Sequence, residues 1–366
     1  MKTLFVLLLA LATAPRPNTT RGPIDMRGVV GVVPHAAGID VYWLHTNELV
    51  TPVRSQLMRT TVANDGLSRL SVTLVRELEG WVTAVVDGRG ANVQAMWRMS
   101  DRNDVRASPI VDGALKYPEG KLVAEYGLYP TMRCDAADCV VIRDLSGTLT
   151  ATLLDADSNV AAAPFPLPAG FAPQQLTLDE RGIFYVRHQL TEKRAALIRR
   201  DGSVQFDVHV ADAEPVAFHA GPVAIAFNGS EYAVAFVDYA PKPDEVQVVT
   251  ISEQGTVSAP VPLLQTEEVS SFANNVSSLS LLRNGAGYLL GGSYVSGRPF
   301  LLQFDGAFQL LDADRPAANP SGMHAAGSDV VISWGAPKPY VTILSADGRM
   351  SPALPVDPMP RRRSVR

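Results

Sequence analysis

A tight hairpin turn followed by an apolar strand recurs along this chain, and this recurrence restricts the possible folds more than any other feature. In VAIAFNGSEYAVAF, residues 223–236, alternating apolar residues indicate strands, and Asn228-Gly229 supplies the positive φ angles that a tight turn needs. The same Asn-Gly-x-x-Tyr spacing returns in RNGAGYLL, residues 283–290. Both faces of the strand after the turn are apolar, so we expect other sheets to cover it on both sides.

A period of 40 to 58 residues emerges when a residue just after each such turn is used as a marker. The markers are Val41, Trp81, Cys139, Ile183, Tyr232, Tyr288 and Val330. A second turn, such as Asp201-Gly202 or Asp305-Gly306, follows most markers, so each unit holds about four short antiparallel strands. We predict an all-β fold, a β-propeller of seven four-stranded blades. Six or eight blades, or two β-sandwiches, are the alternatives.

The segment NGSEYAVAF and its downstream VTISEQGTVSAP resemble repeats of secreted bacterial proteins. In those repeats a D/N-G-x-x-Y-L-V-x-W strand precedes a strand that ends in x-x-D-G-x-V. The likeness is good over residues 215–262 and fair over 279–311, but Phe236 stands where the pattern favours tryptophan, and the Cys134–Cys139 unit lacks the turn glycine. The resemblance implies blades of a β-propeller and export from the cell, and it implies no catalytic residue.

The N-terminal residues predict export. Residues 1–14 contain a lysine, an apolar run and small residues, as in a secretory signal peptide. We expect a linker over residues 15–27, a single propeller domain over 28–357 and a basic, disordered tail over 358–366. No later stretch is apolar over a transmembrane length, and a net charge of −5 argues against a nucleic-acid binder. We therefore expect a secreted bacterial monomer, extracellular or periplasmic, without a membrane span.

The two cysteines of the sequence, Cys134 and Cys139, occupy the places that Phe227 and Tyr232 take in the best-defined unit. They would therefore face each other across a hairpin, within reach of a disulfide. Unpaired thiols and a redox-active pair are the alternatives, although the spacing is not Cys-x-x-Cys. We predict a structural disulfide that closes a short loop.

Linear motifs of common catalytic sites are absent from the sequence: it has no Gly-x-Ser-x-Gly elbow, no His-Glu-x-x-His and no P-loop. DGRG at residues 87–90 is interpreted as a turn, and DADSN at residues 155–159 lacks two features of a calcium loop. His35 and His324 lie in HAAG segments at the two ends, so ring closure would bring them together, as a metal or acid–base pair or as two turn residues. We expect no catalytic residue, no metal site and no cofactor, and the ligand-binding residues stay unknown.

Two functions fit these features. The first is an exported, non-catalytic propeller that binds an extracellular protein, a glycan or a surface ligand through its loops. The second is a secreted glycoside hydrolase or lyase with its site in the central channel, since propellers can host such sites without a linear motif. The enzyme predicts Asp, Glu, His or Arg side chains at the ring centre with perturbed pKa values.

Overall fold

A computed structural model provides the coordinates of the protein. It describes residues 25–47, 53–66, 68–80, 82–99, 103–126, 128–145, 148–168, 175–189, 191–212, 222–238, 245–265, 276–294, 296, 298–314, 320–326, 329–334, 339–345 and 349–357. The predicted signal peptide and the basic tail lie outside these ranges. Within the described residues, no helix is long and apolar enough to cross a membrane.

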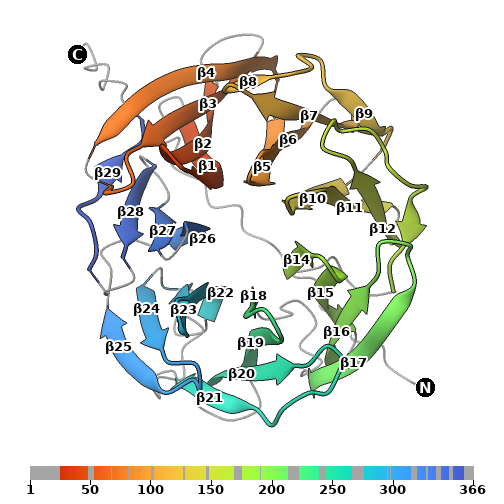
Figure 1. Cartoon of the computed structure of the whole chain (residues 1–366), viewed down its shortest axis with the longest axis vertical. Helices are drawn as coiled ribbons and strands as arrows, with labels where there is room; N and C mark the ends of the chain where they lie inside the picture. Colours follow the sequence, from red (N-terminus) through yellow and green to blue (C-terminus); the bar gives the residue numbers. More distant parts are fainter. Residues whose placement is uncertain are drawn as a thin grey trace, which may run out of the picture.

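Seven antiparallel sheets stand around one axis in chain order, as Figure 1 shows, and each sheet is one blade of a β-propeller. Blade 1 comprises β1 (Asp25–His35), β2 (Gly38–Asn47), β3 (Arg54–Val62) and β4 (Arg69–Glu79). Blade 2 comprises β5 (Val82–Arg89), β6 (Asn92–Met99), β7 (Val105–Val111), β8 (Ala114–Leu115) and β9 (Lys121–Ala124), and both β8 and β9 pair with β7. Blade 3 comprises β10 (Leu128–Cys134), β11 (Cys139–Leu145), β12 (Thr148–Leu154) and β13 (Phe165–Pro166).

The other four blades repeat the same strand order. Blade 4 comprises β14 (Gln175–Asp179), β15 (Gly182–Gln189), β16 (Glu192–Ile198) and β17 (Val204–Asp212). Blade 5 comprises β18 (Val223–Phe227), β19 (Tyr232–Asp238), β20 (Glu245–Ile251) and β21 (Val261–Gln265). Blade 6 comprises β22 (Val276–Asn284), β23 (Gly287–Tyr294), β24 (Pro299–Phe304) and β25 (Leu310–Asp314), and blade 7 comprises β26 (Pro320–Ala326), β27 (Asp329–Trp334), β28 (Tyr340–Leu344) and β29 (Leu354–Pro355).

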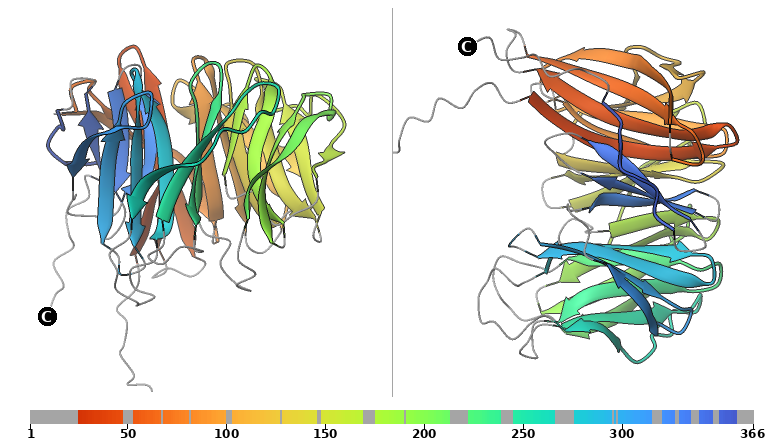
Figure 2. Two further views of the ribbon diagram at one scale, coloured as in Figure 1. Left: turned by 90° about the horizontal axis from the view of Figure 1, so that it is seen from below. Right: turned by 90° about the vertical axis from the view of Figure 1, so that its left-hand side faces the viewer.

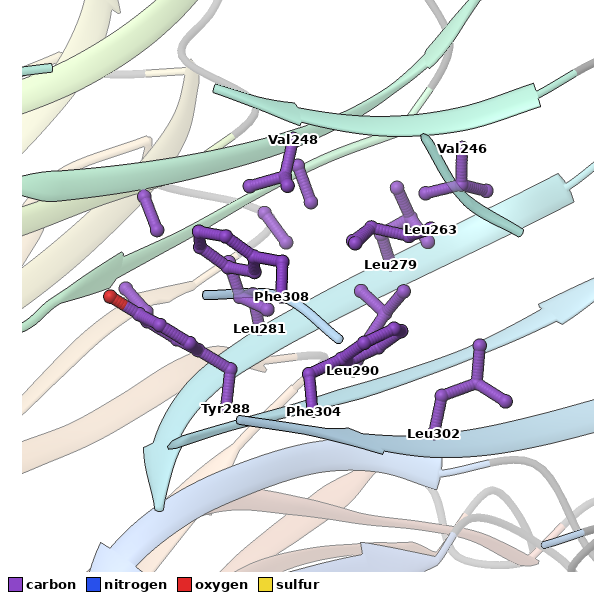
Figure 3. Close-up of a cluster of buried hydrophobic side chains, with 14 of the residues drawn as sticks. Val246, Val248, Leu263, Leu279, Leu281, Tyr288, Leu290, Leu302, Phe304 and Phe308 are labelled. Carbon is purple, nitrogen blue, oxygen red and sulfur yellow. The ribbon is translucent and has the colours of Figure 1, made fainter. Parts of the chain in front are cut away.

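A hydrophobic cluster fills each of the seven seams between neighbouring blades. In the seam of blades 5 and 6, Val248 of β20, Leu281 of β22 and Phe304 of β24 meet, as Figure 3 shows. Each sheet is therefore buried on both faces, which is the pattern that the two-sided apolar strands predicted. This two-sided burial confirms the predicted fold class, an all-β propeller with seven blades.

The ring closes by side-chain packing. Among the described residues, β1 is the innermost strand of blade 1 and β29 the outermost of blade 7, and no strand is exchanged between these blades. A hydrophobic cluster joins the two blades. A buried chain of hydrogen bonds strengthens it, because Trp43 Nε1 donates to Thr60 Oγ1 at 3.0 Å and Thr60 Oγ1 donates to the Val356 carbonyl at 2.7 Å.

The turns between the first and second strands of each blade lie on the same side of the disc as the turns between its last two strands (Figure 2). We call this side the turn face. In every blade, two residues that pair across the first and second strands lie on either side of the first of these turns, with four residues between them in the sequence. We call these two residues the hairpin pair. The pairs are Pro34–Ile39, Gly88–Val93, Cys134–Cys139, Leu178–Ile183, Phe227–Tyr232, Arg283–Tyr288 and Ala325–Val330. This pair fixes which residues of different blades are equivalent.

Five of the seven sequence markers are the second member of a hairpin pair, and two are not. In blade 1 the equivalent residue is Ile39 and not Val41, and in blade 2 it is Val93 and not Trp81. Trp81 itself lies outside the described residues and precedes the first strand of its blade. Trp81 was an incorrect marker because the sequence ELEGW resembles a turn with its following strand. The first hairpin of blade 2 lies one strand later, between β5 and β6.

The predicted equivalence of His35 and His324 is also wrong. His35 pairs with Gly38 and lies after the first residue of its hairpin pair, whereas His324 lies before that residue in blade 7. The two HAAG segments are thus offset by two residues relative to their turns. Small residues such as alanine and glycine are compatible with several turn positions, so their identity does not fix the register.

Candidate functional site at the centre of the ring

Three ionisable side chains come from the same position of three inner strands. The residues that directly precede the hairpin pairs are Val33, Asp87, Arg133, Thr177, Ala226, Leu282 and His324. Asp87 lies on β5, Arg133 on β10 and His324 on β26, which surround the ring axis in Figure 1. All three side chains are half-buried. We call Asp87, Arg133 and His324 the inner-ring trio.

Asp87 joins blades 2 and 3. Its Oδ2 accepts a hydrogen bond of 2.9 Å from the backbone N–H of Cys134, at the edge of β10 that faces away from β11. Burial raises the pKa of the Asp87 carboxyl, while the positive charge of Arg133 and the Cys134 N–H oppose this rise. The Asp87 carboxyl is therefore less solvated than the carboxyl of an ordinary surface aspartate.

His324 is the second titratable group of the trio. Burial lowers the pKa of this imidazole to about 4, and the charge of Arg133 contributes to the decrease. A β-carbon at position 322 would lie 2.9 Å from His324 Nε2, so Gly322 makes room for the ring. The imidazole is therefore neutral at neutral pH and can both donate and accept a hydrogen bond.

Arg133 connects the other two members electrostatically, since its charge acts on the pKa of both Asp87 and His324. Its Nη1 donates to the Met132 carbonyl at 2.8 Å, which holds the side chain against its own strand. The guanidinium is a cation with five N–H donors and no acceptor. The ring centre thus presents a fixed cation, a neutral imidazole and a carboxyl with a raised pKa.

The disulfide lies next to Arg133. Cys134 and Cys139 are bonded to each other across the first hairpin of blade 3, which confirms the predicted bridge. Neighbouring blades bind the same turn: Asn92 Nδ2 of blade 2 donates to the Asp135 carbonyl at 3.0 Å, and Arg200 of blade 4 contacts the carboxylates of Asp135 and Asp138. These contacts fix the end of β10 and with it the position of Arg133.

The other residues considered from the sequence have local roles. His35 lies at a turn, 3.4 Å from Asp40. In the DADSN segment, Asp155 Oδ1 accepts backbone N–H bonds from Asp157 and Asn159, both at 2.8 Å, so the carboxylate caps its own turn. No group of three metal-ligating side chains occurs in the described part of the chain.

Sequence reasoning missed the trio. The sequence predicts a turn at DGRG, but Asp87, Gly88 and Arg89 belong to β5, and the turn begins at Gly90. With Val93 as the marker of blade 2, Asp87, Arg133 and His324 fall at one repeat position. An alignment of the repeats with Val93 as the marker of blade 2 would therefore have shown that these three residues are equivalent.

Comparison with family models and with the sequences of curated proteins gives no match. Solved structures do match. Sqt1 of Saccharomyces cerevisiae has 12% identity and a TM-score of 0.55, over 91% of this chain and 86% of that one. Hydrazine synthase of Kuenenia stuttgartiensis has 12% identity and a TM-score of 0.56, over 93% and 99%. The β-propeller domain of the Trilobed protease of Pyrococcus furiosus, described as having an open velcro topology, has 10% identity and a TM-score of 0.51, over 89% and 95%.

Identities this low support the fold alone, because propellers with unrelated activities share the same architecture. The match to a propeller with an open velcro agrees with the ring closure described above, where no strand is exchanged between blades 7 and 1 among the described residues. The comparisons therefore agree on a β-propeller, and any function must be argued from this chain's own residues.

Proposed function

We propose that the protein is an exported, non-catalytic binding module, and that the inner-ring trio contacts an extracellular ligand with an anionic group and hydroxyl groups, such as an acidic glycan. The observation that carries the proposal is that three blades place Asp87, Arg133 and His324 at one repeat position, while the same position is apolar in blades 1, 5 and 6. Export is supported by the N-terminal apolar run and by the disulfide, which is typical of oxidising compartments.

The chemistry of the trio suits binding. Arg133 offers a planar set of donors for a carboxylate or a sulfate. His324, with a pKa of about 4, stays neutral at neutral pH, so it serves better as a hydrogen-bond partner of hydroxyl groups than as a proton carrier. The rigid backbone of the inner strands holds both groups in place before a ligand arrives, which lowers the entropic cost of binding.

One observation favours the alternative, a glycoside hydrolase or lyase. A carboxyl with a raised pKa is what a general acid needs, and burial raises the pKa of Asp87. A hydrolase of the usual kind needs a second carboxylate at a suitable distance. Another carboxylate on an inner strand, Asp179 of β14, already accepts a hydrogen bond of 2.6 Å from Tyr232 Oη.

A glycan array tests the proposal. The full chain is applied to immobilised acidic and neutral glycans, next to Arg133→Gln and to the control His35→Gln, which changes a turn residue outside the trio. We expect retention on acidic glycans by the wild type and by the control, and loss in Arg133→Gln. Equal retention of all three proteins, or of none, would contradict the proposal. Cleavage of the bound glycan that is lost in Asp87→Asn would establish the enzyme instead.

A further inference from the structure

One position of the repeat holds a buried aromatic ring at the seam between blades in four of the seven blades. It is the fourth residue after the second member of the hairpin pair, on the second strand of each blade. The residues there are Trp43, Trp97, Arg143, Arg187, Phe236, Gly292 and Trp334. The four aromatic residues are buried in the cluster shared with the preceding blade. We call this place the seam position; blades 3 and 4 carry arginine there.

The arginine of blade 4 has an internal partner. Arg187 is 3% exposed, and its Nη2 lies 2.5 Å from Asp207 Oδ2. A buried charge with a carboxylate at hydrogen-bond distance is stabilised within the protein. Arg187 is therefore explained by the structure of its own blade and needs no ligand.

The arginine of blade 3 has no such carboxylate in the part of the chain that the structure describes. Arg143 Nη1 donates to the carbonyl oxygen of Tyr126, and Nε is buried without a hydrogen-bond partner among the described residues. Glu125 is close by but forms no ion pair with it among the described residues. Burial lowers the pKa of the Arg143 guanidinium. This cation is thus partly desolvated, and it forms no ion pair with a described carboxylate.

A cavity opens beside Arg143, at the repeat position where blades 1, 2, 5 and 7 hold an aromatic ring. Its volume is about 410 Å³, and it is lined by Leu122, Val123, Ala124, Glu125, Tyr126 and Arg143. Leu122 and Tyr126 are 47% and 42% exposed, so both side chains are accessible to a ligand. The cavity combines apolar side chains with one guanidinium and the exposed carboxylate of Glu125.

We propose that this cavity, at the seam of blades 2 and 3, binds a carboxylate that is carried on an aromatic or aliphatic group. Arg143 binds the carboxylate, and Leu122 and Tyr126 contact the apolar part. The planar guanidinium matches a carboxylate in shape and can donate charge-assisted hydrogen bonds to it. The carboxyl terminus of a peptide and a free organic acid share this chemistry. The site uses none of the inner-ring trio and is independent of the function proposed above.

Ligand-observed NMR titration of the full chain tests the site with three probes. N-acetylphenylalanine represents a peptide carboxyl terminus, its amide removes only the charge, and benzoate represents a free organic acid. We expect the acid to bind at least about tenfold more tightly than the amide, since a charge-assisted hydrogen bond is lost. Comparable binding of benzoate points to a free acid, and clearly tighter binding of N-acetylphenylalanine points to a peptide terminus.

Two variants and one control complete the experiment. Arg143→Gln should abolish the preference for the acid, and Arg143→Trp, which restores the residue of blades 1, 2 and 7, should fill the cavity and abolish binding of all probes. His35→Gln, at a turn residue outside both sites, should bind as the wild type does. Circular dichroism verifies that each variant is folded. Equal binding of acid and amide, unchanged binding by Arg143→Gln, or no binding of any probe at about 10 mM overturns the proposal.

Discussion

Replacing Tyr232 by phenylalanine should destabilise the protein through one defined hydrogen bond. Tyr232 is fully buried in the seam of blades 4 and 5, and its Oη donates to Asp179 Oδ2 at 2.6 Å. Burial and the Asp179 carboxylate raise the pKa of Tyr232, so the hydroxyl stays protonated and remains the donor. Asp179 is nearly buried and would lose this donor, although Arg181 remains 3.6 Å away.

The magnitude follows from the charge of the acceptor. A hydrogen bond to a charged group contributes about 1.5–3 kcal/mol, and the ring itself is kept in Tyr232→Phe, so we expect a loss of about 2 kcal/mol in the free energy of unfolding. Tyr288 is the matched control, because it occupies the same repeat position but its Oη accepts a neutral bond of 3.2 Å from Asn228 Nδ2. Tyr288→Phe should cost only about 0.5–1 kcal/mol.

The assay is urea denaturation of both variants and the wild type, followed by circular dichroism, with the free energies compared at equal m-values. Equal losses in the two variants would show that the charge of Asp179 does not strengthen the bond. A loss below about 0.5 kcal/mol in Tyr232→Phe would refute the claim that this hydroxyl joins blades 4 and 5.

Three further predictions concern stability. His324→Gln should remove part of the pH dependence of the free energy of unfolding. The pKa of His324 is about 4 in the folded state and 6.5 ordinarily, so the stability that the neutral imidazole contributes is complete above pH 6.5 and is lost as the pH falls towards 4. Gly182→Ala should cost about 3 kcal/mol or more, because φ is +138° and a Cβ would lie 2.1 Å from the Ile198 carbonyl oxygen. Removing the disulfide with Cys134→Ser and Cys139→Ser should cost about 2 kcal/mol, as expected for a short loop.

Each of these predictions has a control. His35→Gln, at a turn residue outside the trio, should retain the pH dependence that His324→Gln removes, and parallel pH profiles of wild type and His324→Gln contradict the account. Gly229 also has positive φ but no atom within 4 Å of a Cβ, so Gly229→Ala should cost only about 1 kcal/mol. Equal costs at the two glycines would contradict the steric argument. For the disulfide, treatment of the wild type with a reductant should reproduce the loss seen in the double variant.

The propeller was predictable because its repeat is encoded locally. Asn228-Gly229 fixes a turn, and Tyr232 and its two-sided apolar strand require sheets on both sides. The same reasoning located Cys139 across a hairpin from Cys134, and the disulfide confirms it. These features depend on residues within one blade, so the sequence reports them directly.

The candidate sites were not predictable in the same way. The residues of the inner-ring trio are far apart in the chain, and only the correct register of blade 2 shows that Asp87 is equivalent to Arg133. Arg143 is inconspicuous in the sequence, because its meaning comes from the aromatic residues at the seam position of other blades. Both sites depend on differences between repeats, which become visible only after the repeats are aligned in space.

The most direct test of the inner-ring trio is an NMR titration of His324. Assignment by comparison with His324→Gln gives the resonance, and its pKa is measured in the wild type and in Arg133→Gln. We predict a pKa of about 4 in the wild type. In Arg133→Gln the pKa should be higher, because the positive charge from blade 3 is gone. A pKa near 6.5 that is the same in both proteins would contradict the convergence of blades 3 and 7 at the ring centre.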